Sequence, residues 1–94
     1  MNYPWFCYLL ECADGSIYTG ITTDLVRRVR EHNAGTASRY TRGRTPVRLS
    51  YWEELSNRGE ATRRELHLKA LPREEKLALI AGKNISRDLF VSQA

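Results

Sequence analysis

The sequence predicts one small α/β domain of the α+β type, in which a three-stranded, mainly antiparallel sheet is flanked by helices in the order β-β-α-β-α-α. Two short apolar segments, residues 5–12 and 16–22, flank a turn sequence and predict a β-hairpin. Two later segments carry apolar residues at helical spacing, and each follows a residue type that commonly caps helices. With 94 residues the chain can bury one modest core, so we expect a single domain.

The turn of the hairpin decides whether Tyr8 and Tyr18 lie on the same face of the sheet. A two-residue loop would place the two phenols on opposite faces. A three-residue loop, 13–15, with Gly15 in the left-handed conformation shifts the register by one residue and pairs Tyr8 with Gly20. The two tyrosines then share a face. Because a shared site requires this arrangement, we predict the three-residue loop.

The first predicted helix follows the hairpin, with Asp24 or Thr23 as its cap, and ends near Ala34 before Gly35. The next segment of the chain, residues 36–46, is predicted to be a loop because it is polar and lacks helical or strand periodicity.

On the first helix, the apolar face is formed by Leu25 and Val29. His32 falls on this face, and Arg28 falls at its margin. By the same helical spacing, Arg27 is expected to point into solvent. A helical histidine on an apolar face is more often a satisfied core residue than a functional one, so both interpretations of His32 stay open here.

A third strand is predicted at about residues 47–54, followed by a helix that runs to Leu71. Asn57 and Glu60 have the spacing of a capping box at the start of this helix. Pro72 suits the first turn of a further helix.

Glu65 lies in the apolar stripe of the helix that ends at Leu71, together with Ala61 and Leu68. An unpaired carboxylate on such a face is costly unless a cation or a donor satisfies it. A structural ion pair with an arginine and a bound metal ion are the two alternatives.

The net charge of +4 suits a polyanionic partner, and the apolar segment 5–10 is too short to span a bilayer. We therefore expect no membrane partner and a cytoplasmic location. The domain is expected to cover residues 1–82, and a tail, 83–94, can dock on its core.

Two tripeptides, Cys7-Tyr8-Leu9 and Tyr18-Thr19-Gly20, stand where the GIY-YIG nuclease family has its two signature tripeptides. Over roughly residues 5–81 the chain resembles the small stand-alone bacterial members of this family. It departs from the family pattern in having cysteine for the first glycine and threonine for the isoleucine, and Asn84 is the one counterpart of a late asparagine. Four further residues match family positions: Arg28, His32, Glu65 and Lys69.

The resemblance implies a role for each matched residue. Tyr8 would activate the attacking water with Tyr18 as its partner, and Arg28 would bind the scissile phosphate. His32 would orient Tyr8 or a water, or act as a base. Glu65 would hold a single divalent ion, Mg²⁺ or Mn²⁺, which can bind one carboxylate and keep several waters.

The segment 36–46 contains three arginines and no acidic residue, which is typical of a phosphate-contacting surface, although many charged segments are only solvated. The residues expected to contact nucleic acid are Arg39, Arg42, Arg44 and Lys69. Such contacts reach the backbone and carry no base specificity.

Taken together, these patterns predict a metal-dependent endonuclease that hydrolyses phosphodiester bonds in DNA, or alternatively in RNA, and recognises shape rather than sequence. A non-catalytic nucleic-acid-binding module with the same fold is the second hypothesis, and a protein-binding role is the third. Glu65 and Tyr8 discriminate between the first two, because binding alone needs neither residue.

Overall fold

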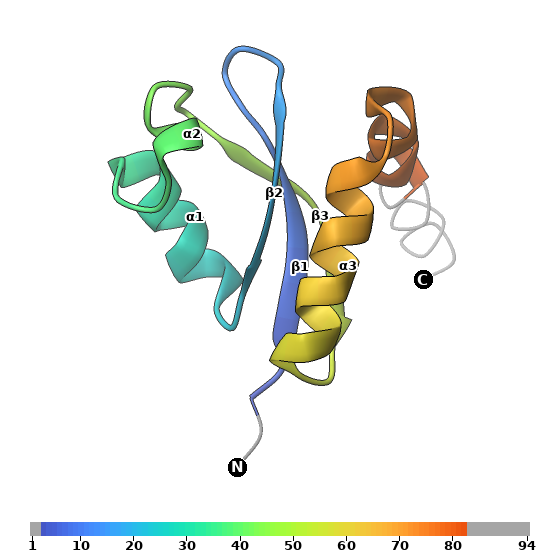
Figure 1. The fold of residues 1–94 in the computed structure, drawn as a ribbon. Coiled ribbons are helices and arrows are strands. Elements are labelled where there is room, and N and C mark those ends of the chain that lie inside the picture. Colours follow the sequence, from blue (N-terminus) through green and yellow to red (C-terminus); the bar gives the residue numbers. More distant parts are fainter. Residues whose placement is uncertain (1–2, 83–94) are drawn as a thin grey trace, which may run out of the picture.

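The computed structural model describes residues 3–82, so the predicted tail, 83–94, lies outside the described residues. Its elements follow the predicted order, which confirms the fold class (Figure 1). They are β1 (Trp5–Glu11), β2 (Ile17–Thr22), α1 (Leu25–Ala34), α2 (Arg39–Arg42), β3 (Arg48–Leu55), α3 (Arg58–Ala70) and a last helical segment at 73–82. Within this range, none of the helices combines the length and the apolar character needed to cross a bilayer.

The three strands form one antiparallel sheet in the order β2-β1-β3, so β1 is central and β2 is an edge strand. Helix α1 covers one face of the sheet, and α3 covers the opposite face (Figure 1). Neighbouring residues of β1 therefore face different helices. Tyr8 faces α1, whereas Cys7, which pairs with Glu53, faces α3.

The hairpin has the predicted register. Tyr8 pairs with Gly20 and Leu10 pairs with Tyr18, and Gly15 adopts a left-handed φ of 85°. The three-residue loop is confirmed, and the rings of Tyr8 and Tyr18 lie on one face with their centroids 6.5 Å apart.

The helix caps also agree with the prediction. The Asp24 side chain accepts a hydrogen bond from the amide of Arg27, and Gly35 ends α1 with a φ of 82°. At α3, Asn57 accepts from the Glu60 amide, and the helix ends at Ala70, one residue earlier than expected. The carboxylate of Glu60 accepts from the amide of Ser56, the residue before the cap, and not from the amide of Asn57 as in a capping box.

The segment 36–46 is not simply a loop, contrary to the prediction, because it contains the short helix α2. The side chain of Ser38 caps this helix by accepting a hydrogen bond from the amide of Thr41 at 3.1 Å. A single turn buries too few apolar residues to produce a helical pattern in the sequence. Local capping, rather than amphipathicity, therefore specifies α2.

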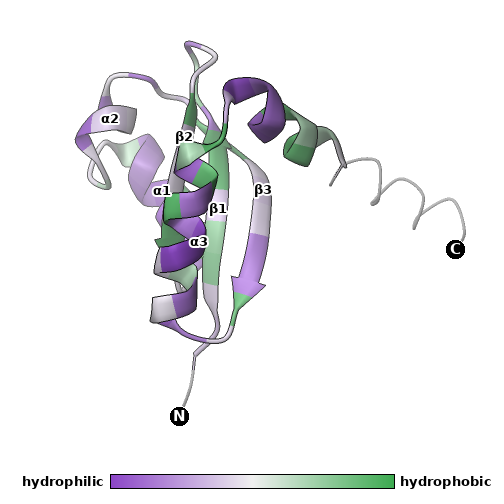
Figure 2. Ribbon diagram, turned by 45° about the vertical axis from the view of Figure 1, so that its right-hand side comes forward, coloured by the Kyte–Doolittle hydropathy of each residue, from purple (hydrophilic) through white to green (hydrophobic). Residues whose placement is uncertain are grey.

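The core between the sheet and α1 is built around four buried side chains, and Figure 2 shows that β1 is more apolar than β3. Partly buried side chains from α1 and β3 pack against this cluster. The four are Tyr8, Leu10, Cys12 and Val47. On the other face, Ala61 and Leu68 of α3 are buried, and Arg64 binds Glu53 of β3 through two hydrogen bonds of 2.7 and 2.8 Å.

The connection from α1 to β3 is held at both of its ends. Asn33 of α1 donates to the carbonyl of Val47 at 3.2 Å and accepts from the amide of Val47 at 2.7 Å. Near the hairpin turn, the amide of Ala13 donates to the carbonyl of Arg44, and Arg44 forms an ion pair with Asp14 at 2.9 Å. These contacts fix α2 against the C-terminal part of α1.

Replacing Asn33 by Ala removes both side-chain hydrogen bonds to Val47 and leaves the amide of this buried residue without its acceptor. We expect the free energy of unfolding to fall by about 1–3 kcal/mol. Urea denaturation of Asn33→Ala and of Arg30→Ala, an exposed residue on the same helix, measures the difference. Equal stability of the two variants would show that the Asn33 clamp does not hold the connection.

Candidate active site

The candidate site lies on the α1 side of the hairpin, where Tyr8, Tyr18 and His32 pack together. Tyr8 is 1% exposed, and its ring leans over β2. A Cβ atom at Gly20 would lie 2.5 Å from the Tyr8 hydroxyl oxygen, so position 20 must be glycine for the phenol to lie there. The ring of His32 meets the ring of Tyr18 edge-on, with centroids 5.0 Å apart.

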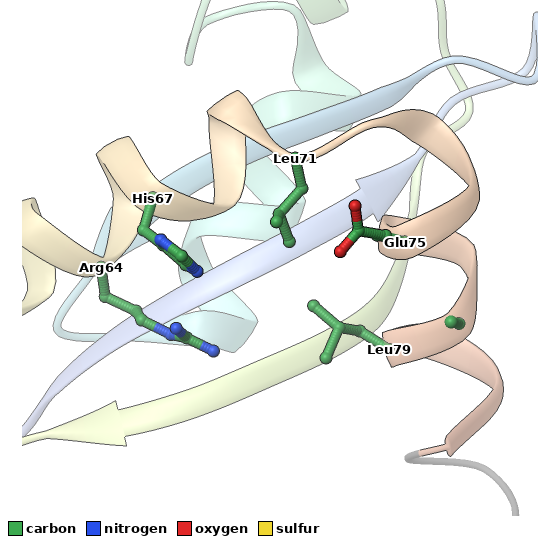
Figure 3. A pocket seen from close by; sticks show the side chains of 6 residues that line it. Arg64, His67, Leu71, Glu75 and Leu79 are labelled. Carbon is green, nitrogen blue, oxygen red and sulfur yellow. The ribbon is translucent and has the colours of Figure 1, made fainter.

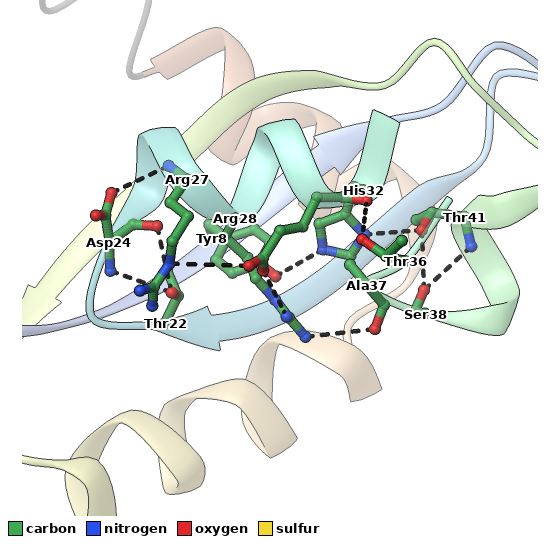
Figure 4. Close-up of polar contacts among 11 residues, drawn as sticks. Tyr8, Thr22, Asp24, Arg27, Arg28, His32, Thr36, Ala37, Ser38 and Thr41 are labelled. Carbon is green, nitrogen blue, oxygen red and sulfur yellow. Dashed lines mark hydrogen bonds and ion pairs between the residues drawn. The ribbon is translucent and has the colours of Figure 1, made fainter. Parts of the chain in front are cut away.

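A buried chain of hydrogen bonds starts at the Tyr8 hydroxyl (Figure 4). The hydroxyl lies 2.9 Å from Nε2 of His32, and Nδ1 of His32 lies 2.7 Å from the hydroxyl of Thr41. The Thr41 hydroxyl lies 2.9 Å from that of Ser38. His32 and Thr41 have no exposed surface. The sequence places His32 here through its helical spacing, but it did not lead us to Thr41 or Ser38.

The cap of α2 was the signal that could have found these two residues. Ser38 precedes Thr41 by three residues, which is the spacing of an N-cap and its hydrogen-bonded position. A helix starting there would turn Thr41 toward α1, although nothing in the sequence indicates that Thr41 becomes buried.

Burial sets the protonation of the central pair. It raises the pKa of Tyr8 to about 12, and the neighbouring Arg28 guanidinium opposes that rise. Burial and, to a lesser extent, the positive charge of Arg28 together lower the pKa of His32 to about 4. At neutral pH the phenol is therefore protonated and the imidazole is uncharged.

Arg28, on α1, is the cation of the site, and neighbouring residues of the chain hold its guanidinium in place. Its guanidinium donates to Glu31 at 2.9 Å and to the carbonyl of Ala37 at 3.4 Å. Its Nε atom is buried and has no hydrogen-bond partner among residues 3–82. One buried donor of a cation beside Tyr8 thus lacks a partner in this part of the chain.

Glu65 lies outside this cluster, in the other helical layer. It lies on α3, and its charge contributes to raising the pKa of Tyr8, after burial and after the effects of closer groups. Its side chain is 19% exposed, so it lies at the margin of the buried stripe rather than inside it. Its carboxylate forms an ion pair with Lys69 at 3.5 Å, and the adjacent Arg64 pairs with Glu53.

The donor set fits a hard divalent ion held mainly by water and phosphate. No group of three or more His, Cys, Asp or Glu side chains gathers within the described part of the chain. A single, partly exposed carboxylate is compatible with Mg²⁺, which keeps several waters and takes other ligands from phosphate oxygens. Glu65, on α3, can supply this carboxylate.

The four residues expected to contact nucleic acid have different surroundings. Arg39 and Arg42 are exposed on α2, and Lys69 is half-exposed beside Glu65. Arg44 instead binds Asp14 at 2.9 Å and the carbonyl of Tyr40 at 2.7 Å, and its guanidinium lies 4.0 Å from the centre of the Tyr40 ring.

Tyr40 links this arginine to the site. Its ring stacks on that of Tyr18, with centroids 5.9 Å apart. The Asp14–Arg44 ion pair, the ring of Tyr40 and the ring of Tyr18 therefore form a continuous series of contacts from the hairpin turn to the cluster. In this structure Arg44 therefore packs against Tyr40, which in turn packs against Tyr18 of the site.

A hollow of about 370 Å³ lies elsewhere, between α3 and the helical segment 73–82 (Figure 3). Arg64 and His67 extend into it from α3, and Glu75 and Leu79 extend from the last helical segment. Its lining shares no residue with the cluster around Tyr8 and His32. His67 thus belongs to a different part of the surface from His32.

Comparison with known sequences agrees with the family that the sequence resembles. The family described as GIY-YIG catalytic domain matches residues 4–78, most of the chain. The chain therefore belongs to the GIY-YIG family of nucleases. A nucleic-acid substrate and dependence on a divalent metal are general properties of this family.

Within the family, its relatives are small UPF0213 proteins. One from Halobacterium salinarum is 56% identical over 72 residues, covering 77% of this chain and 94% of the relative. One from Clostridium perfringens is 47% identical over 90 residues, covering 96% and 94%. The solution NMR structure of the UPF0213 protein BH0048 from Bacillus halodurans is 44% identical, covers 85% of both chains and has a TM-score of 0.55.

The low pKa of His32 predicts a specific dependence of stability on pH. The unfolded chain binds a proton at this histidine below about pH 6.5, whereas the folded protein does so only below about pH 4. The contribution of the neutral His32 to the free energy of unfolding is therefore fully present above pH 6.5. About 3 kcal/mol of it is lost as the pH falls toward 4.

Urea unfolding of the wild type and of His32→Gln at pH 7 and pH 4.5 measures this contribution, because other titrating groups are common to both proteins. We expect the wild type to lose more stability than the variant over this interval. Equal losses would show that His32 titrates normally in the folded protein.

Proposed function

We propose that this protein is a metal-dependent endonuclease that hydrolyses phosphodiester bonds in DNA and is directed by the shape of its substrate. The observation that carries the proposal is the 2.9 Å contact between the Tyr8 hydroxyl and an uncharged, fully buried His32, beside the Arg28 cation. A merely structural core would gain nothing from placing a cation and an imidazole against the same phenol.

Tyr8 and His32 can together remove a proton from an attacking water. As the water oxygen bonds to phosphorus, its proton passes to the Tyr8 oxygen, and the phenolic proton passes to Nε2 of His32. The phenol is then neutral before and after the transfer, so its high pKa does not have to be overcome in a separate ionisation. The negative charge of a bound phosphate favours the imidazolium that results.

Arg28 is suited to bind the phosphate that is attacked. Its guanidinium is planar, and its buried Nε is without a partner in the described structure. A phosphate oxygen would satisfy this donor and compete with Glu31 for the others. The interaction strengthens as negative charge builds up on the phosphate oxygens, which makes it an interaction of the transition state.

Glu65 would hold the divalent ion from the α3 side. When bound, Mg²⁺ or Mn²⁺ would supply positive charge for the leaving 3′ oxygen and for the phosphate. Lys69, one helical turn away, currently neutralises part of the charge of Glu65 and can contact a neighbouring phosphate instead.

The exposed arginines of α2 indicate where the substrate backbone runs. Arg39 and Arg42 stand on the short helix that also carries Thr41, which contacts His32 directly. DNA bound there would pass close to the cluster. Contacts of this kind reach phosphates and carry no base information, so recognition would depend on the shape of the DNA.

A non-catalytic module that only binds nucleic acid is the second candidate. It is favoured by one observation: the pKa of Tyr8, about 12, and that of His32, about 4, both oppose transfer of a proton between them in the free protein. The two candidates differ in cleavage, not in binding.

Replacing Arg28 by Ala should lower the single-turnover rate of cleavage by orders of magnitude and change affinity much less. Replacing the exposed Arg42 by Ala should weaken binding and reduce its salt dependence by about one unit, with little effect on the rate at saturating DNA. Binding against salt and single-turnover cleavage of mixed DNA structures measure both. If Arg28→Ala cuts at the wild-type rate, Arg28 does not bind the phosphate that is attacked, and if the wild type binds these DNA structures but cuts none of them, the binding module is the better assignment.

Replacing Glu65 by Gln should abolish cleavage and leave the melting temperature within about 5 °C of the wild type, because its partly exposed ion pair with Lys69 contributes little to stability. Cleavage by the wild type should require Mg²⁺ or Mn²⁺ and stop on addition of a chelator. A folded Glu65→Gln variant that still cuts DNA would remove Glu65 from the metal site.

A further inference from the structure

Resting on the proposed function, we propose that Thr41 is a positioning residue that, with Ser38, keeps the proton of His32 on Nδ1 and so leaves Nε2 free to accept the proton of Tyr8. Neither residue belongs to the set that the sequence predicted. Thr41 touches His32 and not the reacting atoms, so it acts through the histidine.

The argument begins at the buried phenol. Tyr8 is 1% exposed, and a buried hydroxyl hydrogen needs an acceptor. Its hydrogen-bond partner in the described structure is Nε2 of His32. The neighbouring Arg28 can only donate. If Nε2 carried the proton, the phenolic hydrogen would have no acceptor in this environment, so the structure favours Nε2 as the lone-pair nitrogen.

The other side of the ring agrees with this direction. A neutral imidazole protonated on Nδ1 donates to the Thr41 hydroxyl at 2.7 Å. Thr41 can then donate its own hydrogen to the Ser38 hydroxyl oxygen at 2.9 Å. Ser38 also accepts from the amide of Thr41 as the cap of α2, and its own hydrogen is left for solvent because Ser38 is only half-buried.

The reverse direction satisfies fewer groups. In it, Ser38 donates to Thr41, Thr41 donates to Nδ1, and Nε2 donates to the Tyr8 oxygen. The phenolic hydrogen then has no acceptor, and Nε2 can no longer receive a proton. The two directions differ by one buried donor, which is enough to bias a tautomeric equilibrium.

The fold holds Thr41 firmly enough for this task. Thr41 has no exposed surface, and α2 is fixed by its Ser38 cap and by the contacts of Asn33 and Arg44 at the two ends of the connection. A threonine on a freely moving loop could not select one tautomer. Here its hydroxyl position is determined by α2.

The tautomer can be measured directly by NMR on the full-length ¹⁵N-labelled protein at pH 7. The chain has two histidines, and the exposed His67 provides an internal reference for an unconstrained ring. We expect His32 in the wild type to be protonated on Nδ1. Thr41→Val removes the hydroxyl at nearly constant volume and should shift His32 toward the Nε2-protonated form, whereas Thr41→Ser should retain the wild-type tautomer.

Single-turnover cleavage provides the second measurement. We expect Thr41→Val to cut about 10- to 100-fold more slowly, the scale of losing the outer partner of a functional histidine, and Thr41→Ser to cut at close to the wild-type rate. Thr36→Val is the matched control, because the Thr36 hydroxyl bonds a backbone carbonyl of α1 and does not contact His32. It should change neither the tautomer nor the rate.

A wild-type His32 protonated on Nε2 would overturn the inference, and so would an unchanged tautomer in Thr41→Val. If Thr41→Val does not fold, the wild type and Thr41→Ser still decide the matter. If the tautomers follow the expectation but the wild type cuts no DNA, the positioning by Thr41 stands and the proposed nuclease activity falls.

Discussion

The hydrogen bond between Tyr8 and His32 joins the central strand of the sheet to α1 inside the core, and most of the site depends on it. Both partners are almost completely buried, so neither can exchange this bond for one to water. The bond fixes the ring of His32. This ring in turn contacts Tyr18 and forms a hydrogen bond with Thr41 of α2. Three segments that are distant in the sequence are thereby brought to one phenol.

The same burial explains why the site is electrically unusual. Taking an imidazole and a phenol out of water disfavours their charged forms, and the Arg28 cation lowers the pKa of both. The result is a neutral pair beside a positive charge. A bound anion would alter this pair, because it would compensate the charge of Arg28 and favour a protonated His32.

The fold was largely predictable because it depends on local rules. The hairpin register follows from the loop length and Gly15, and both long helices start at residues whose side chains cap them. His32 and Arg28 were predictable from helical spacing. Thr41 was not, because its burial depends on how α2 packs against α1, and one turn of helix leaves no periodic pattern.

The surroundings of Glu65 and Arg44 show a second limit. Helical spacing predicts Glu65 inside the buried stripe of α3, whereas its side chain lies at the margin of this stripe and pairs with Lys69, and Arg64 pairs with Glu53 on a neighbouring strand. Likewise, Arg44 looks like a free surface cation in the sequence, and only the docking of its loop on the hairpin turn reveals its pair with Asp14. Ion pairs between distant segments are set by tertiary packing.

The close approach of the Tyr8 hydroxyl to Gly20 has an evolutionary consequence. Any side chain at position 20 would occupy the place of the phenol oxygen, so glycine there is demanded by the tyrosine across the strand pair and not by the strand itself. We therefore expect the two positions to change together, although they belong to different signature tripeptides. Descendants that lose the tyrosine are released from the glycine, and a chain that has replaced the glycine can no longer hold the phenol in this place.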